Sequence, residues 1–415
     1  YGLNKVLSFD MGGTTAKICL IKNKTPKTAR VFEVARSYRF KKGSGMPISI
    51  PVIDMVEIGA GGGSLAHVDT LGQIRVGPES AGSEPGPACY GRGGTRPAVT
   101  DADLMLGKLD PDSFAGGAIR LSIADAKTAL IGTLGQSLDM DAVTAAFGLA
   151  EVVDENMANA ARVHAVENGE DLAEYTMIAF GGAAPLHAAR LCEKLGITRC
   201  LIPKGAGVGS AIGFLRAPFS FEASRSVYMR LSDLSPETVQ DLFTELEAEA
   251  TGFVRSCDAT APIKAEHKIY MRYVGQGWEI PVSLTAAQAA HPDAETYLKL
   301  FEADYTRLFG RVVDGLDIEI TVWSVNAATP TATVTLVKPL TEVTSAKSAD
   351  HRQMFDTALG NMTTAQVTAR SGLVPGDRIC GPAIITEDET TIIIPSSRRA
   401  TVQNDGTVDI ERVTA

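Results

Sequence analysis

The chain lacks the cysteine patterns that staple small domains or bind zinc. Its 415 residues hold six cysteines and no CxxC pair, so the sequence predicts neither a disulfide framework nor a zinc knuckle. Scattered thiols of this kind fit a reducing cytoplasm, where most serve as small buried hydrophobic groups. The cysteines are Cys19, Cys89, Cys192, Cys200, Cys257 and Cys380.

Long apolar runs and excess positive charge are absent as well. No hydrophobic stretch approaches the roughly 20 residues of a membrane-spanning helix, so we expect a soluble protein with no membrane partner. The formal net charge of −10 repels a phosphate backbone, and no basic stripe interleaved with aromatic residues offsets it. We therefore do not expect nucleic acid as a partner.

The length and composition are those of an ordinary globular protein with two or three domains. The 415 residues are 45% hydrophobic and 21% charged. We expect an α/β domain at residues 1–217, a smaller α+β domain at 218–330 and a C-terminal β-rich module at 331–415. Within the first domain, the pattern of apolar residues predicts a hairpin around residues 65–76 and a long helix at 139–168. Because Tyr1 is not a methionine and a strand-like run follows almost at once, we interpret the chain as a fragment.

The strongest local signal is the motif DMGGTT at residues 10–15, which lies between two strand-like runs. Paired glycines permit a sharp reversal and leave main-chain N–H groups open to phosphate oxygens. Threonine hydroxyls add donors, and the acidic residue can hold a water of the metal that accompanies ATP. The alternative is a plain hairpin turn. The residues assigned to this phosphate site are Asp10, Gly12, Gly13, Thr14, Thr15 and Lys17.

A second glycine turn, FGGAAP at residues 180–185, follows the strand-like run TMIAF and precedes a helical segment at residues 186–195. With the following run RCLIP this makes a βαβ unit, whose ligand loops lie at the carboxyl ends of parallel strands. We assign Gly181, Gly182 and Ala183 to nucleotide binding, because small residues let a flat base or ribose lie on the backbone at a helix N-terminus. A simple strand-to-helix turn is the alternative.

Glycine and proline crowd the segment from Gly59 to Thr100, far beyond the needs of a connector. Such a segment is a shaped loop or a mobile one. We interpret part of it as a substrate loop, in which an arginine can bind a carboxylate or phosphate through two hydrogen bonds. The residues assigned to this loop are Gly61, Gly62, Gly63, Ser64 and Arg92.

Several side chains near this loop are candidates for catalysis. Asp10 and Asp101 are assigned as catalytic residues and metal ligands, and helix capping is the alternative for Asp101. A general base is sought among Glu57, His67 and Glu84, with a surface position as the alternative for His67. The thiol of Cys89 is a conceivable nucleophile, against a buried structural role.

Taken in order, the motifs resemble the hydantoinase A family, which includes 5-oxoprolinase and the nucleotide-binding subunits of acetone and acetophenone carboxylases. The resemblance rests on DMGGTT, VEIGAGGGSLAHVDTLGQIRVGPESAGSEPGPACYGRGG, PAVTDADLMLGKL, AFGGAAPLHAARL and GVGSAIGFL. It is most specific from about Lys5 to Ala217. It implies a lobe of the actin, hexokinase and heat-shock ATPase superfold, with its ribonuclease-H-like core.

The resemblance also implies ligands and partners. These are ATP, Mg²⁺ or Mn²⁺, a small-molecule substrate and a hydantoinase B type subunit. Full-length relatives have an earlier domain with its own first phosphate clamp, so the resemblance implies a missing N-terminal lobe from the same gene product or another chain. DMGGTT would then be the second phosphate motif.

Two departures from the family pattern limit what is carried over. Many relatives have DMGGTSTD where this chain has DMGGTTAK, so Lys17 replaces an acid near the phosphates. It can contact a phosphate as a point charge, or lie on the solvent face of a strand. Relatives often have a histidine where Glu302 stands, so any activity of that histidine is not transferred.

The family implies ATP-dependent activation of an unreactive oxygen by phosphorylation. Our first hypothesis is ring-opening hydrolysis of a cyclic amide of the hydantoin, oxoproline or lactam type. The alternative is ATP-dependent carboxylation of a ketone. A hypothesis from another class of function is that the chain is a non-catalytic scaffold subunit, as Lys17 suggests. A sugar or acetate kinase fits less well because of the long glycine loop.

Overall fold

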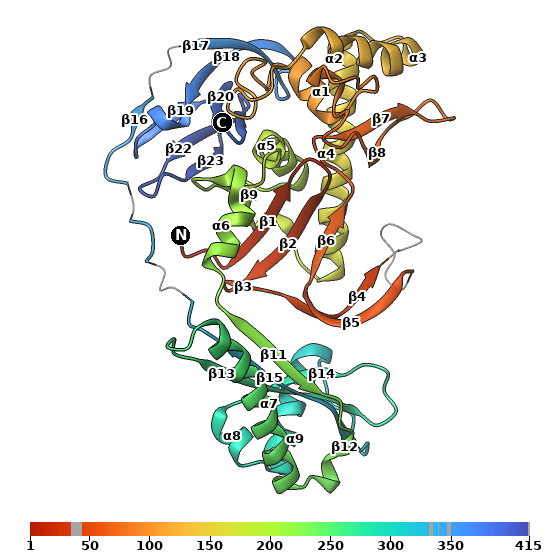
Figure 1. The fold of residues 1–415 in the computed structure, drawn as a ribbon, viewed down its shortest axis with the longest axis vertical. Helices are drawn as coiled ribbons and strands as arrows, with labels where there is room; N and C mark the ends of the chain where they lie inside the picture. Colours follow the sequence, from red (N-terminus) through yellow and green to blue (C-terminus); the bar gives the residue numbers. More distant parts are fainter. Residues whose placement is uncertain (35–43, 332–334, 339, 347–349, 414–415) are drawn as a thin grey trace. The chain divides into compact units, whose positions relative to one another are not determined.

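The computed structural model describes residues 1–34, 44–331, 335–338, 340–346 and 350–413. The chain divides into two compact units, one formed by Tyr1–Ile212 with Thr335–Ala415 and the other by Gly213–Val334 (Figure 1). The residues expected as a separate C-terminal module are grouped with the first unit in this division. Their last strand, β23 (Val408–Arg412), pairs with β10 (Arg199–Ile202) and so continues the sheet of the first unit.

A mixed sheet forms the centre of the first unit. Strand β1 (Lys5–Met11) pairs antiparallel with β2 (Ala16–Lys22), which confirms the predicted hairpin. On its other side, β1 pairs parallel with β9 (Thr176–Phe180), and β9 pairs parallel with β10. The motifs at residues 10–15 and 181–183 therefore follow the carboxyl ends of two neighbouring parallel strands, where ligand loops of α/β sheets lie.

Two helices pack side by side against this sheet (Figure 1). The long helix α4 (Ala142–Glu167) confirms the helix expected at residues 139–168. Asp141 caps it by accepting a hydrogen bond from Thr144 N, and its alanine-rich buried face permits close packing. The second, α5 (Ala184–Leu195), ends at Gly196, which has the left-handed conformation common at helix C-termini.

The remaining strands of the first unit extend the main sheet or form smaller ones. They are β3 (Thr25–Pro26), β4 (Thr28–Val34), β5 (Met46–Ile53), β6 (Met55–Ile58), β7 (Ser64–Val68), β8 (Ile74–Ser80), β16 (Thr344–Ser345), β17 (Asp350–Asp356), β18 (Asn361–Ala369), β19 (Asp377–Cys380), β20 (Ala383–Thr386), β21 (Thr391–Ile394) and β22 (Arg398–Val402). The pair β7 and β8 is the second predicted hairpin.

The other helices in this part of the chain are short. They are α1 (Val99–Met105), α2 (Ile123–Leu130), α3 (Gln136–Leu138), α6 (Gly209–Arg216), and the single turns η1 (Ala88–Tyr90), η2 (Ile131–Gly135), η3 (Leu172–Glu174), η4 (Ala206–Val208) and η6 (Arg370–Gly372). Within the described ranges, no helix has the length and apolar character needed to cross a membrane.

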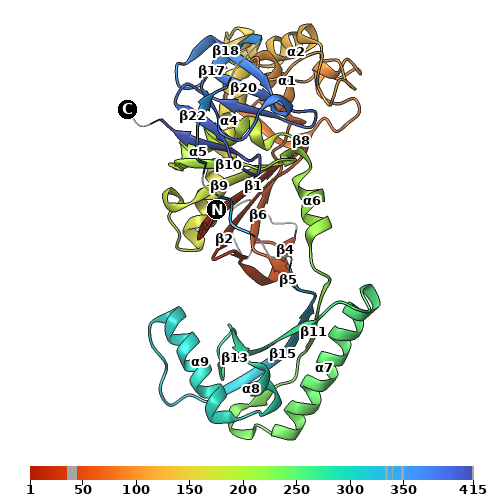
Figure 2. The ribbon, with the colours of Figure 1, turned by 90° about the vertical axis from the view of Figure 1, so that its left-hand side faces the viewer.

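The second unit is an antiparallel sheet in the order β11-β15-β13-β14, with β12 beside β15 and helices on one face (Figure 2). Trp323 and Phe243 are buried in its own core. Its elements are β11 (Ser220–Arg225), β12 (Met229–Arg230), η5 (Leu231–Asp233), α7 (Pro236–Cys257), β13 (Lys264–Tyr273), β14 (Ile280–Leu284), α8 (Ala286–Ala290), α9 (Ala294–Phe309) and β15 (Ile318–Ala328).

Candidate functional site

The first glycine turn presents open hydrogen-bond donors. Gly12 N donates to Thr15 O over 3.1 Å and closes the turn. Within the part of the chain that the structure describes, the N–H groups of Gly13 and Thr14 donate to no residue, and nothing lies within 4 Å of a side chain built on Gly12 or Gly13. The turn therefore offers free amides and space for an anion.

The second glycine turn touches the first. Gly181 has a φ of +99°, and a Cβ added to it would lie 2.4 Å from Asp10 Oδ1. Ala183 N donates to Met11 O over 2.9 Å, while Gly182 is exposed. The structure thus brings together the two motifs that the sequence assigns to phosphate and to nucleoside.

A third turn, to which the sequence assigned no role, completes the surroundings of Asp10. Ser210 Oγ donates to Asp10 Oδ2 over 3.0 Å, and Gly181 N donates to Ala206 O over 2.7 Å. The signal that could have revealed it is the segment GAGVGS directly after β10. Asp10 therefore lies where three glycine-rich turns meet, and we name these turns with Asp10 the glycine-turn site (Asp10–Thr15, Gly181–Ala183 and Gly205–Ser210).

The C-terminal segment also reaches the glycine-turn site. Thr390 Oγ1 donates to Gly182 O over 2.9 Å, and a Cβ on Gly207 would lie 2.4 Å from Glu389 Cβ. The loop is held in place by the ion pair of Glu387 with Arg370 at 2.6 Å. The sequence did not place this loop beside Gly182, because the two lie about 200 residues apart along the chain.

The predicted substrate loop packs against the first glycine turn and donates hydrogen bonds to its carbonyl oxygens. Gly62 N and Gly63 N donate to the carbonyl oxygens of Gly12 and Gly13 over 3.0 and 2.7 Å. A Cβ on Gly61 would lie 2.5 Å from Gly13 C and Thr14 N, so glycine is required there for close backbone approach. Gly61 to Ser64 are buried, which favours a structural over a substrate-facing position.

Three other candidate residues lie at the surface of the first unit. Arg92 is exposed, with its guanidinium 5.9 Å from the ring centre of Tyr90. Lys17 stands across the hairpin from Asp10, and its ammonium is 3.9 Å from Glu57 Oε1. Since 44% of the Lys17 side chain is exposed, this geometry favours the solvent-face alternative. His67 is also exposed.

Both carboxylate oxygens of Asp101 accept hydrogen bonds from backbone N–H groups. One of its oxygens accepts from Cys89 N at 2.7 Å, and the other accepts from Ala98 N at 2.7 Å and Ala88 N at 3.1 Å. Both oxygens are fully buried, which favours the capping alternative over a metal ligand. Burial and the nearby Asp101 raise the pKa of the Cys89 thiol, which disfavours a thiolate nucleophile.

A buried charged cluster, Asp103–Lys108–Asp154–His187, was missed from the sequence. His187 Nδ1 lies 2.8 Å from Asp154 Oδ1 and Nε2 lies 3.2 Å from Asp103 Oδ2. Lys108 Nζ donates to Asp103 Oδ1 over 2.8 Å. All four side chains are buried. With two carboxylates against two cations, the cluster is close to neutral, as buried charges require.

Stability is expected to depend on the protonation of His187. Burial lowers its pKa, but Asp103 and Asp154 outweigh burial and raise the pKa to about 9 from 6.5. This stabilisation is complete below pH 6.5 and is lost as the pH rises through about 9. Denaturant titrations should show the unfolding free energy of the wild type, minus that of His187→Gln, falling by about 3 kcal/mol across this window. A constant difference would show a neutral ring.

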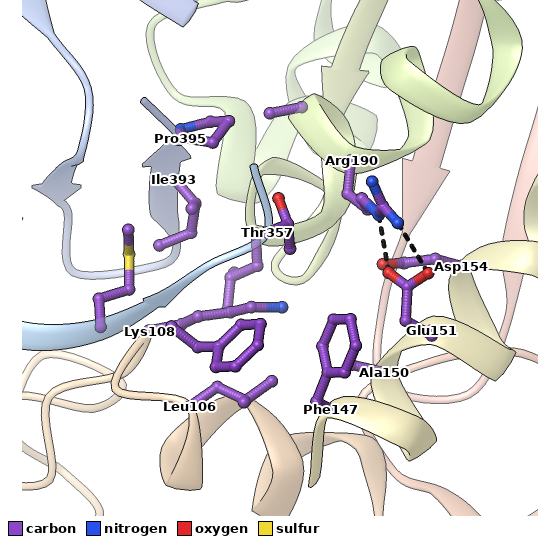
Figure 3. Close-up of a pocket in the computed structure, with 14 residues that line it drawn as sticks. Leu106, Lys108, Phe147, Ala150, Glu151, Asp154, Arg190, Thr357, Ile393 and Pro395 are labelled. Carbon is purple, nitrogen blue, oxygen red and sulfur yellow. Dashed lines mark hydrogen bonds and ion pairs between the residues drawn. The ribbon is translucent and has the colours of Figure 1, made fainter. Parts of the chain in front are cut away.

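Beside the cluster lies a cavity of about 20 Å³, lined by Lys108, Phe147 and Glu151 among others (Figure 3). It has room for about one water molecule, so it is no nucleotide site. Arg190 closes one side through its ion pair with Glu151 at 2.7 Å. Nowhere in the described residues do three or more metal-ligating side chains gather to hold an ion.

The chain resembles known proteins along nearly its whole length. A profile of the hydantoinase/oxoprolinase family matches residues 1–223, and one of its C-terminal domain matches residues 232–411. The chain is 30% identical to the caprolactamase subunit alpha of Pseudomonas jessenii, over 99% of this chain and 58% of that protein. It is 27% identical to the acetophenone carboxylase gamma subunit of Aromatoleum aromaticum, over 99% and 57%.

A solved structure shares the fold. The crystal structure of the ATP-dependent caprolactamase from Pseudomonas jessenii superimposes with a TM-score of 0.77 and 29% identity, over 100% of this chain and 59% of that one. The chain therefore spans somewhat under three fifths of the length of these relatives. Since a family profile covers more than half of it, the chain belongs to the hydantoinase/oxoprolinase family.

Proposed function

We propose that this chain binds the nucleotide in an ATP-dependent enzyme that phosphorylates a cyclic amide, of the hydantoin, oxoproline or lactam type, for ring-opening hydrolysis. The observation that carries the proposal is the meeting of the Asp10 turn and the Gly181 turn, joined by Ala183 N to Met11 O at 2.9 Å. The similarity to a caprolactamase subunit supports the choice of a lactam-type substrate.

The proposal includes the fold of the first unit as a lobe of the actin, hexokinase and heat-shock ATPase superfold. An antiparallel hairpin next to parallel strands, β1–β2 beside β9 and β10, supports this assignment. In such a lobe the turn of the hairpin faces phosphates and the turn after β9 faces the nucleoside.

The free N–H groups of Gly13 and Thr14 would donate to phosphate oxygens, and the exposed Gly182 leaves room for the nucleoside. Mg²⁺ commonly uses one or two carboxylates together with the phosphates and water. The single carboxylate of Asp10, oriented by Ser210 Oγ at 3.0 Å, suits a metal that arrives with the nucleotide. ATP, when bound, supplies the phosphoryl group that activates the amide oxygen.

Partners form part of the proposal because the chain spans 58% of the caprolactamase subunit that it matches. We include a hydantoinase B type subunit and a further N-terminal lobe, from the same gene product or another chain, to close the nucleotide site. A cytoplasmic location is proposed with them. Ketone carboxylation is the second candidate, favoured by the similarity to an acetophenone carboxylase subunit.

Product analysis tests the proposal and separates the two reactions. The complete assembly is incubated with ATP and either a lactam or hydantoin, or a ketone with bicarbonate, and ADP or AMP release is followed together with the organic product. We expect release that depends on the cyclic amide and yields the ring-opened acid. Release that requires the ketone and bicarbonate would establish the second candidate, and no nucleotide turnover with either would support a scaffold role.

A further inference from the structure

A closed circuit of contacts links the two glycine turns through the protein interior. Gly12 O accepts from Gly62 N over 3.0 Å, and Gly62 O accepts from Thr100 N over 2.8 Å. The Thr100 hydroxyl donates to the same oxygen over 2.8 Å. The first turn is thus tied through one loop to the start of helix α1.

The circuit continues across the buried charged cluster. Asp103 lies three residues after Thr100, so both residues project from the same side of α1. Asp103 Oδ2 lies 3.2 Å from His187 Nε2 on helix α5. Helix α5 follows the second glycine turn directly, and Ala183 N returns to the first turn through Met11 O at 2.9 Å. The only side-chain to side-chain step in this circuit is the contact of Asp103 with His187.

The orientation of His187 is fully determined by its neighbours. Its ring is completely buried, and each ring nitrogen faces a carboxylate, Asp103 on one side and Asp154 on the other. Asp154 belongs to helix α4, which has no part in the circuit. Both carboxylates contact the ring, but only Asp103 belongs to the circuit, and Asp103 also accepts from Lys108 Nζ over 2.8 Å.

We propose that His187 is a positioning residue that, through Asp103, holds α1 against α5 and sets the spacing of the two glycine turns. Where this spacing matters for ATP, the inference rests on the proposed function. As far as it concerns how rigidly the two turns are held, the inference rests on the contacts alone. The cluster thus acts on the glycine-turn site without touching the nucleotide.

In the full chain, Asp103→Asn and Asp154→Asn each remove one charge that faces the buried histidine, and His187→Gln is the check that leaves the pair of Asp103 with Lys108 in place. Amide hydrogen exchange without nucleotide is measured at Gly62, Gly63 and Ala183. Asp103→Asn should speed their exchange by about 10-fold relative to core amides of the second unit, whereas Asp154→Asn should leave the ratio unchanged. His187→Gln, which keeps the side-chain size, should reproduce Asp103→Asn and serves if that variant does not fold.

Nucleotide affinity provides the second measurement. The Kd of the assembly for ATP should rise about 10-fold in Asp103→Asn and His187→Gln, but not in Met157→Ala, which destabilises the core of α4 without entering the circuit. Equal exchange in the two aspartate variants would overturn the positioning role. If the wild type binds no ATP, the proposed function fails while the exchange comparison still decides this inference.

Discussion

Asp10→Asn is expected to reduce nucleotide turnover by the complete assembly at least about 100-fold, in line with the loss of one preorganised charge at a phosphoryl-transfer site. Asparagine has the same shape, and its amide oxygen can still accept from Ser210 Oγ, which lies 3.0 Å from Asp10 Oδ2. The fold should therefore persist while the negative charge that we propose orients a metal-bound water is lost. Substrate-dependent release of ADP or AMP measures the effect.

Ser210→Ala is the matched control for Asp10→Asn. It removes the hydroxyl that donates to Asp10 but keeps the carboxylate charge, so we expect a loss of about 10-fold or less, the worth of one hydrogen bond to a charged group. Unchanged turnover and unchanged nucleotide affinity in Asp10→Asn would reject the assignment of this turn to phosphate. An equal loss in both variants would mean that the orientation of Asp10 matters as much as its charge.

Local elements were predictable because they depend on neighbouring residues. The hairpin at residues 5–22 follows from two apolar runs around paired glycines, and it is present as β1 and β2. The helix expected at 139–168 is present as α4 with its cap at Asp141. The βαβ unit at residues 176–202 is confirmed as well, because periodicity and turn residues agree along it.

The surroundings of these turns were not predictable, since they arise from contacts between distant segments. His187 sits among apolar residues in AAPLHAARL, and its partners Asp103 and Asp154 come from two other helices. Nothing in a single segment signals that pairing. The C-terminal strand β23 likewise pairs with β10, which lies far away along the chain.

The sequence located the glycines of residues 61–63 but did not reveal their structural role. The run of glycines at residues 61–63 suggested a loop for substrate, whereas the structure uses it for backbone-to-backbone packing under the first turn. Both purposes require a residue without a side chain, so sequence cannot separate them. Spatial neighbours decide, and here the nearest atoms are the main chain of Gly13 and Thr14.

Gly181→Ala is expected to destabilise the protein and to impair the glycine-turn site together. Its φ of +99° disfavours any residue with a side chain, at about 1–2 kcal/mol. The added Cβ would also meet Asp10 Oδ1 at 2.4 Å and Met11 O at 2.6 Å, and such overpacking costs a further ~1–3 kcal/mol. Urea denaturation should show a total loss of about 2–5 kcal/mol, with weakened ATP binding.

Gly196→Ala separates the conformational cost from the cost of overlap with Asp10. Gly196 ends α5, the helix that follows Gly181, and it has a φ of +72° with nothing within 4 Å of its added Cβ. This variant incurs only the conformational cost of about 1–2 kcal/mol and should bind ATP as the wild type does. The difference between the two variants measures the overlap with Asp10. If both lose the same stability and both bind ATP normally, the second glycine turn does not press against Asp10, and the two turns do not act on one nucleotide.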